Sequence, residues 1–161
     1  MSTGGGLHAY VATVHAGQRA GLGVVFVNAR GQVLRRVGRR APVSTNDHVA
    51  FQGIIYALWT ARRLGSRRVV VHSDHPAVVA QINGDLDVRA DLIGPYLEVR
   101  ALLNAYRSAS VEPGQIGWEQ EALAMAETAL TFDLNAVDVT DVVVEDLPLW
   151  SWQVTAEPTP A

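Results

Sequence analysis

The sequence predicts an α/β domain in which helices pack on a mixed five-stranded sheet. Three observations support this. The 161 residues are 48% hydrophobic and 18% charged, which is enough apolar material for one buried core. The first forty residues hold three β-branched segments separated by short turns. Beyond them, segments with helical periodicity alternate with short apolar runs, which is the pattern of helices covering a sheet.

The first three predicted strands form an antiparallel meander, because only short turns separate them. They span residues 8–15, 22–28 and 33–37. Ser44 or Thr45 can cap the helix that follows, and an apolar stripe at Phe51, Ile54 and Leu58 marks its buried face. Gly65 ends this helix.

A buried strand follows at residues 68–72, and we expect it to run parallel to the first strand because a helix connects the two. Pro76 opens a short helix that reaches Ile82, and a longer amphipathic helix spans residues 92–106. A last short strand is predicted at either 110–112 or 116–118, before an alanine-rich helix at 119–130.

The chain divides into a flexible N-terminus (1–6), one domain (7–130) and an acidic, aromatic C-terminal extension (131–161). All 13 basic residues are arginines and lie before residue 111, whereas residues 111–161 contain ten acids and no arginine. This asymmetry predicts either an anion-binding body with an acidic tail or two halves that attract each other. Residues 136–146 alternate valine with acids, so they form either an edge strand or an acidic linker.

The composition also excludes several classes of protein. Cysteine is absent, which rules out disulfides, thiolate metal sites and cysteine nucleophiles. No apolar run is long enough to cross a membrane, and the first residues lack the features of a secretory signal. We therefore expect a cytoplasmic protein with no membrane partner.

Several short motifs, in order, resemble the type I ribonuclease H family between Leu7 and Leu130. They are Gly21-Leu-Gly-Val-Val-Phe26, Ser44-Thr-Asn46, Val71-His-Ser-Asp74, Ile82-Asn-Gly84, Pro95-Tyr-Leu-Glu-Val-Arg100 and Glu121-Ala-Leu-Ala124. The resemblance implies the ribonuclease H-like fold, with three antiparallel strands followed by parallel strands. It also implies cleavage of the RNA strand of RNA–DNA hybrids by two Mg²⁺ ions that four carboxylates hold.

The carboxylate set of this family is incomplete in the sequence. Asp74 matches the carboxylate at the end of the central strand, and Glu121 matches the one on the last helix. Tyr10 and Ala50 stand where the other two carboxylates are expected. Asp47 could compensate only if the helix entry shifts, and the simpler interpretation is a first-turn acid that favours the helix dipole. Asp74 and Glu121 are therefore the predicted catalytic remnants, joined by Asp47 as metal ligands only if the protein is active.

The predicted nucleic-acid-binding residues are Thr45, Asn46, Arg39 and Arg40. Thr45 and Asn46 match family positions that touch the nucleic acid backbone, and arginine pairs recognise phosphate through two hydrogen bonds. The alternative is that the arginine pairs form a solvated surface. His72 and His75 flank Asp74 but match no standard metal motif, so they are interpreted as surface and cap residues.

Three functions remain open from the sequence. The preferred one is a ribonuclease H-like protein that lacks two-metal nuclease activity and binds nucleic acid, such as an RNA–DNA hybrid, or a protein partner. The second is a weak Mg²⁺- or Mn²⁺-dependent ribonuclease H that uses Asp74, Glu121 and Asp47. The third is a structural or regulatory homodimer subunit that associates through residues 131–161. No cofactor is required unless the protein is active, in which case the metal is Mg²⁺ or Mn²⁺.

Overall fold

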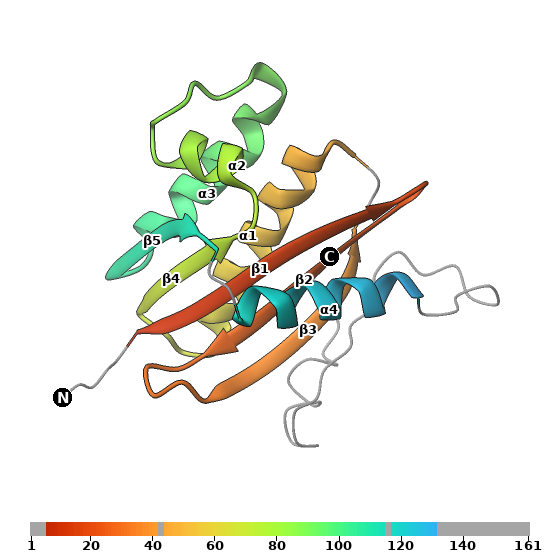
Figure 1. The fold of residues 1–161 in the computed structure, drawn as a ribbon. Helices are drawn as coiled ribbons and strands as arrows, with labels where there is room; N and C mark the ends of the chain where they lie inside the picture. The colour runs from red at the N-terminus through yellow and green to blue at the C-terminus, as the bar shows by residue number, and fades with distance from the viewer. Residues whose placement is uncertain (1–5, 42–43, 115–116, 132–161) are drawn as a thin grey trace.

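The computed structural model describes residues 6–41, 44–114 and 117–131 (Figure 1). Its strands are β1 (Leu7–Ala16), β2 (Arg19–Val27), β3 (Val33–Ala41), β4 (Arg68–Ser73) and β5 (Ser108–Pro113). Its helices are α1 (Asn46–Arg63), α2 (Pro76–Ile82), α3 (Ile93–Asn104) and α4 (Trp118–Thr131), with a short 3-10 turn, η1 (Ala90–Leu92), before α3.

The five strands form one mixed sheet in the order β3-β2-β1-β4-β5. β1 pairs antiparallel with β2, and β2 pairs antiparallel with β3. β4 pairs parallel with both β1 and β5. The predicted fold class is confirmed, including the parallel arrangement that the α1 connection required.

Helices cover the two faces of the sheet unequally (Figure 1). On β1, Leu7, Ala9 and Val11 point into the larger core, which lies beneath α1 and α3. The intervening Tyr10 and Ala12 point into a smaller cluster beneath α4. This alternation is the two-residue period of a strand, and it places α4 alone on its face, packed against β1, β2 and β3.

The backbone of α4 lies unusually close to the sheet because glycines lie beneath it. A Cβ atom added at Gly23 would collide with the carbonyl oxygen of Ala122, and one added at Gly38 would collide with that of Met125. Side chains at these two strand positions would lift the helix away from the sheet. The height of α4 over the sheet is therefore set by backbone contact.

The element boundaries differ from the predictions in a few places. β3 continues to Ala41 instead of ending at Val37, because its C-terminal half pairs with β2 as far as Ala20. The last strand is at 108–113, which confirms the first of the two alternatives. Thr45 is the N-cap of α1: its hydroxyl accepts a hydrogen bond from the backbone N–H of His48 at 3.2 Å. Residues 132–161, and with them the predicted edge strand or linker at 136–146, lie outside the described residues.

In the described part of the chain, no helix combines the length and the apolar character that crossing a membrane requires.

Candidate functional site

Asp74 is held at the carboxyl end of β4 by backbone contacts to β1. Its N–H donates to the carbonyl oxygen of Val11 at 3.2 Å, and its Oδ2 accepts from the N–H of Thr13 at 3.4 Å. Partial desolvation raises the pKa of Asp74, although the Thr13 hydrogen bond and the nearby His75 act in the opposite direction. The predicted position of Asp74, at the end of the central parallel strand, is confirmed.

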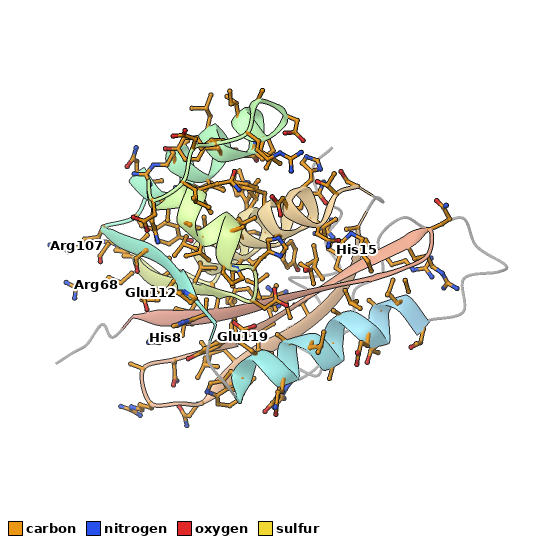
Figure 2. The ribbon with its side chains drawn as sticks, turned by 45° about the horizontal axis from the view of Figure 1, so that its top comes forward. His8, His15, Arg68, Arg107, Glu112 and Glu119 are labelled. Carbon is orange, nitrogen blue, oxygen red and sulfur yellow. The ribbon has the colours of Figure 1, made fainter. Side chains whose placement is uncertain are left out.

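Glu119, in the first turn of α4, is the second carboxyl group at this site (Figure 2). Both of its carboxyl oxygens are buried and have no hydrogen-bond partner among the described residues. The carboxyl group packs so closely on Gly114 that a Cβ atom there would lie 2.6 Å from its Oε2. Burial, and then the charge of Asp74, raise the pKa of Glu119 to about 8.

The Asp74 charge adds to the effect of burial on Glu119, because a second negative charge nearby is unfavourable. With a pKa of about 8, Glu119 is mostly protonated at pH 7, so the pair carries less negative charge than two free carboxylates.

Tyr10 fills the space where the family resemblance implies a carboxylate on the first strand. Its ring stacks on His72 of β4 with 4.4 Å between ring centroids and lies 6.2 Å from the ring of Trp118. Nδ1 of His8 lies 3.0 Å from Nε2 of His72, which extends the stack along the α4 side of the sheet. Burial, and then the charge of Glu119, raise the pKa of Tyr10, so its phenol remains neutral.

Ala50, the other carboxylate position, is fully buried in the core between α1 and the sheet. Asp47, one turn earlier, is an acid in the first turn of α1, which confirms its position at the start of the helix. Its Oδ1 lies 2.6 Å from Nε2 of His75, and its Oδ2 lies 3.8 Å from Nη1 of Arg89. These partners turn the Asp47 carboxylate toward the starts of α1 and α2.

The structure does not bring Glu121 together with Asp74. Oε1 of Glu121 lies 2.9 Å from Nε of Arg36 on β3, and three strand spacings, about 14 Å, separate β3 from β4. Residues 119 and 121 point about 200° apart around a helix, so only one of them can face the end of β4. The match in sequence selected Glu121, whereas the orientation of the helix selects Glu119. The angular difference between residues 119 and 121 could have identified Glu119 only if the face of α4 that packs on the sheet had been known.

The side chains do not fit a two-metal centre. Asp74 and Glu119 are the carboxyl groups gathered at the end of β4, and a phenol and a methyl group stand at the other two positions. Within residues 6–41, 44–114 and 117–131, no group of three histidine, aspartate or glutamate side chains is placed to hold a metal ion. Of the predicted set of Asp74, Glu121 and Asp47, Glu121 is paired with Arg36 on β3, whereas Asp74 and Asp47 both lie near His75.

The four predicted nucleic-acid-binding residues are also separated. Arg39 lies over the ring of Tyr56 on α1 at 4.8 Å, whereas Arg40 reaches the carbonyl oxygen of Leu130 at the end of α4 at 3.3 Å. Neighbouring residues on a strand face opposite sides of the sheet, so Arg39 and Arg40 lie on different faces. Thr45 and the exposed Asn46 lie at the start of α1.

The geometry agrees with comparisons to known proteins. A model of the family described as reverse transcriptase-like matches residues 9–126. Ribonuclease H1 from the halophilic archaeon Halobacterium salinarum is 26% identical, with a TM-score of 0.73 over 78% of this chain and 98% of that one. The N-terminal ribonuclease H domain of a Mycobacterium tuberculosis protein is 25% identical, with a TM-score of 0.71 over 78% of this chain and 94% of that one.

A third similar structure is LC11-RNase H1, which was solved in complex with an RNA/DNA hybrid. It is 18% identical, with a TM-score of 0.69 over 78% of this chain and 99% of that one, a likeness that concerns the fold. No curated protein matches the sequence significantly. Because the family model spans most of the chain and the strand order agrees, the chain belongs to the reverse transcriptase-like family and has a ribonuclease H-like fold.

Proposed function

We propose that this chain binds nucleic acid, with an RNA–DNA hybrid as the first ligand to test, and does not hydrolyse it by two-metal chemistry. One observation carries the proposal: the end of β4 holds Asp74 beside a Glu119 whose pKa of about 8 keeps it protonated at neutral pH. A centre for two divalent ions needs dense negative charge at this place. The side chains here supply one readily ionised carboxyl group.

The same loss of charge favours metal-independent binding of a polyanion. Four carboxylates repel phosphate unless cations neutralise them, whereas a phenol, a methyl group and a protonated glutamate do not. Residues 1–131 contain 13 arginines and ten acids, so this part of the chain is basic overall. The exposed Asn46 at the start of α1 and Arg39 on β3 are the contacts that we assign first.

The decisive experiment measures binding and cleavage of a labelled RNA–DNA hybrid in the same samples. We expect equal affinity with EDTA and with Mg²⁺, no cleavage with Mg²⁺ or Mn²⁺, and affinity that falls steeply with salt. Asn46→Ala and Arg39→Ala should weaken binding. Arg107→Ala is the matched control, because Arg107 is exposed at the opposite end of the parallel strands (Figure 2).

Two results would overturn the proposal. Cleavage that Asp74→Asn abolishes would identify the chain as a nuclease. Failure to bind an RNA–DNA hybrid, double-stranded RNA and single-stranded RNA at low salt would exclude nucleic acid as the ligand. A protein partner or a second subunit would then be tested.

A second candidate, a weak nuclease that holds one metal ion, has a specific observation in its favour. Both buried oxygens of Glu119 lack a hydrogen-bond partner in the described part of the chain, and the Asp74 charge contributes to the raised pKa of Glu119, so a cation could satisfy both groups. Such a cation must displace the Glu119 proton, so Mn²⁺ affinity should rise with pH up to about 8. Calorimetric titration of Mn²⁺ at pH 6.5 and 8.5 tests this, with Glu119→Gln expected to abolish the pH dependence. Absence of Mn²⁺ binding at both pH values would exclude it.

A further inference from the structure

β3 is an edge strand with a long free side. It is nine residues long and pairs with β2 on one side, while no described residue pairs with its other side. An edge of this length presents a row of N–H and C=O groups that can pair with another strand. A segment that occupies this edge must therefore pair with the backbone groups of β3 and complement the charge of the β3 side chains.

β3 carries four arginines, two on each face of the sheet. Arg35 and Arg39 are the partners of Phe26 and Leu22, which belong to the core beneath α1. Arg36 and Arg40 lie on the α4 side, where they contact Glu121 and the Leu130 carbonyl. An incoming strand that places acids opposite Arg35 and Arg39 would match the charge of the α1 side.

The chain leaves α4 beside the C-terminal end of this edge strand. The carbonyl oxygen of Leu130 accepts from Arg19 Nη1 at 2.9 Å and from Arg40 Nη2 at 3.3 Å. Arg40 is the penultimate residue of β3. The continuation after Thr131 therefore starts where an antiparallel strand along β3 would also start.

The sequence beyond Thr131 contains a segment that suits this position. Residues 137–146 read Val-Asp-Val-Thr-Asp-Val-Val-Val-Glu-Asp, which is rich in β-branched residues and contains no glycine or proline. Asp141 and Glu145 are four residues apart, as are Arg35 and Arg39, and residues four apart share one face of a strand.

We propose that residues 137–146 supply an antiparallel sixth strand of the sheet, of which residues 139–146 pair with β3. The register that places Asp141 opposite Arg39 also places Glu145 opposite Arg35. The same register sets Val143 opposite the buried Val37. Seven residues, 132–138, then connect Thr131 to Val139 opposite Ala41, a span of up to about 23 Å. The pairing closes this edge of the sheet within one molecule.

Amide hydrogen exchange on the full chain tests the pairing. We expect slow exchange for the amides of β3 that point away from β2 and for the amides of 137–146 that point toward β3. The double variant Val142→Pro/Val143→Pro should accelerate exchange in both segments by about tenfold or more. Two adjacent prolines are used because successive N–H groups point to opposite sides of a strand. One of the two prolines therefore removes an N–H group that would donate to β3. Val154→Pro/Thr155→Pro, in the same extension but outside the segment, is the matched control and should change neither.

Charge exchange tests the register. Asp141→Arg should accelerate exchange, and adding Arg39→Glu to it should restore the protection, whereas Asp146→Arg, on the other face of the strand, should not be rescued by Arg39→Glu. Exchange of 137–146 at the rate of an unstructured peptide in the unmodified chain would overturn the proposal. Protection that rises with protein concentration would also overturn it, because it would assign the β3 edge to a second copy of the chain.

Discussion

Nε of Arg36 on β3 lies 2.9 Å from Oε1 of Glu121 on α4, and this ion pair belongs to the side of the helix that faces away from Asp74. The charge of Asp74 acts instead on Glu119, two residues earlier in the helix. Two glutamates only two residues apart therefore have different surroundings, and substitutions of the two should have different effects.

Glu119 should make the folded protein less stable as the pH rises. Its pKa is about 8 in the folded chain and near the usual 4.5 in the unfolded chain, so between these values the folded state holds a proton that the unfolded state releases. The free energy of unfolding falls across this window. Asp74, whose folded pKa is also raised, acts in the same direction.

Glu119→Gln should remove most of this decline, on the order of 2 to 3 kcal/mol between pH 5 and pH 8. Urea denaturation at pH 5, 6.5 and 8 measures it. Glu121→Gln is the control and should keep the pH dependence of the unmodified chain, because its carboxylate is half-exposed and paired with Arg36. An unchanged decline in Glu119→Gln would contradict the assignment.

Tyr10 should contribute to stability through its ring. It is buried between His72 and Trp118, so Tyr10→Ala should destabilise the fold by about 3 to 5 kcal/mol, as large-to-small substitutions in a core do. Tyr10→Phe keeps the stack and should cost less than about 1 kcal/mol. Equilibrium denaturation of both variants distinguishes the ring from the hydroxyl, and equal losses would show that the hydroxyl matters more than the stack.

The close approach of α4 should make Gly38 intolerant of a side chain. Gly38→Ala places a methyl group against the carbonyl of Met125 and should destabilise the fold by about 2 kcal/mol or more. A methyl group added at Gly94 on α3 would meet no atom within 4 Å, so Gly94→Ala should be neutral or slightly stabilising. Thermal unfolding compares the two, and similar melting temperatures would show that α4 can shift without cost.

The contact between Asp47 and His75 should contribute modestly to stability. Asp47→Ala removes both this contact and a favourable charge at the start of α1, at a cost of about 1 kcal/mol. Asp91→Ala removes an exposed contact with Arg89 and should change stability by less than about 0.5 kcal/mol. Denaturation at pH 7 compares these matched substitutions, and a larger effect for Asp91 would reverse the assigned importance.

The sequence was sufficient to predict the order and type of the elements, because strand and helix periodicities differ and turn residues separate them. The resemblance to the ribonuclease H family also located Asp74 at the end of the central strand. The sequence could not identify Glu119, because the facing residue of α4 depends on how close the helix lies to Gly23 and Gly38. Nor could it show that Arg39 and Arg40 serve different faces, which required the extent of β3.

The glycine contact beneath α4 has a consequence for how the family can diverge. Since the backbone sets the distance between helix and sheet, substitutions among the outward side chains of α4 leave the first turn in place. Lineages can therefore exchange the chemical groups at the end of β4, such as phenol for carboxylate, while inheriting an unchanged frame around them. In such a protein, loss of an ancestral reaction need leave little trace in the backbone, and resemblance of shape outlasts resemblance of chemistry.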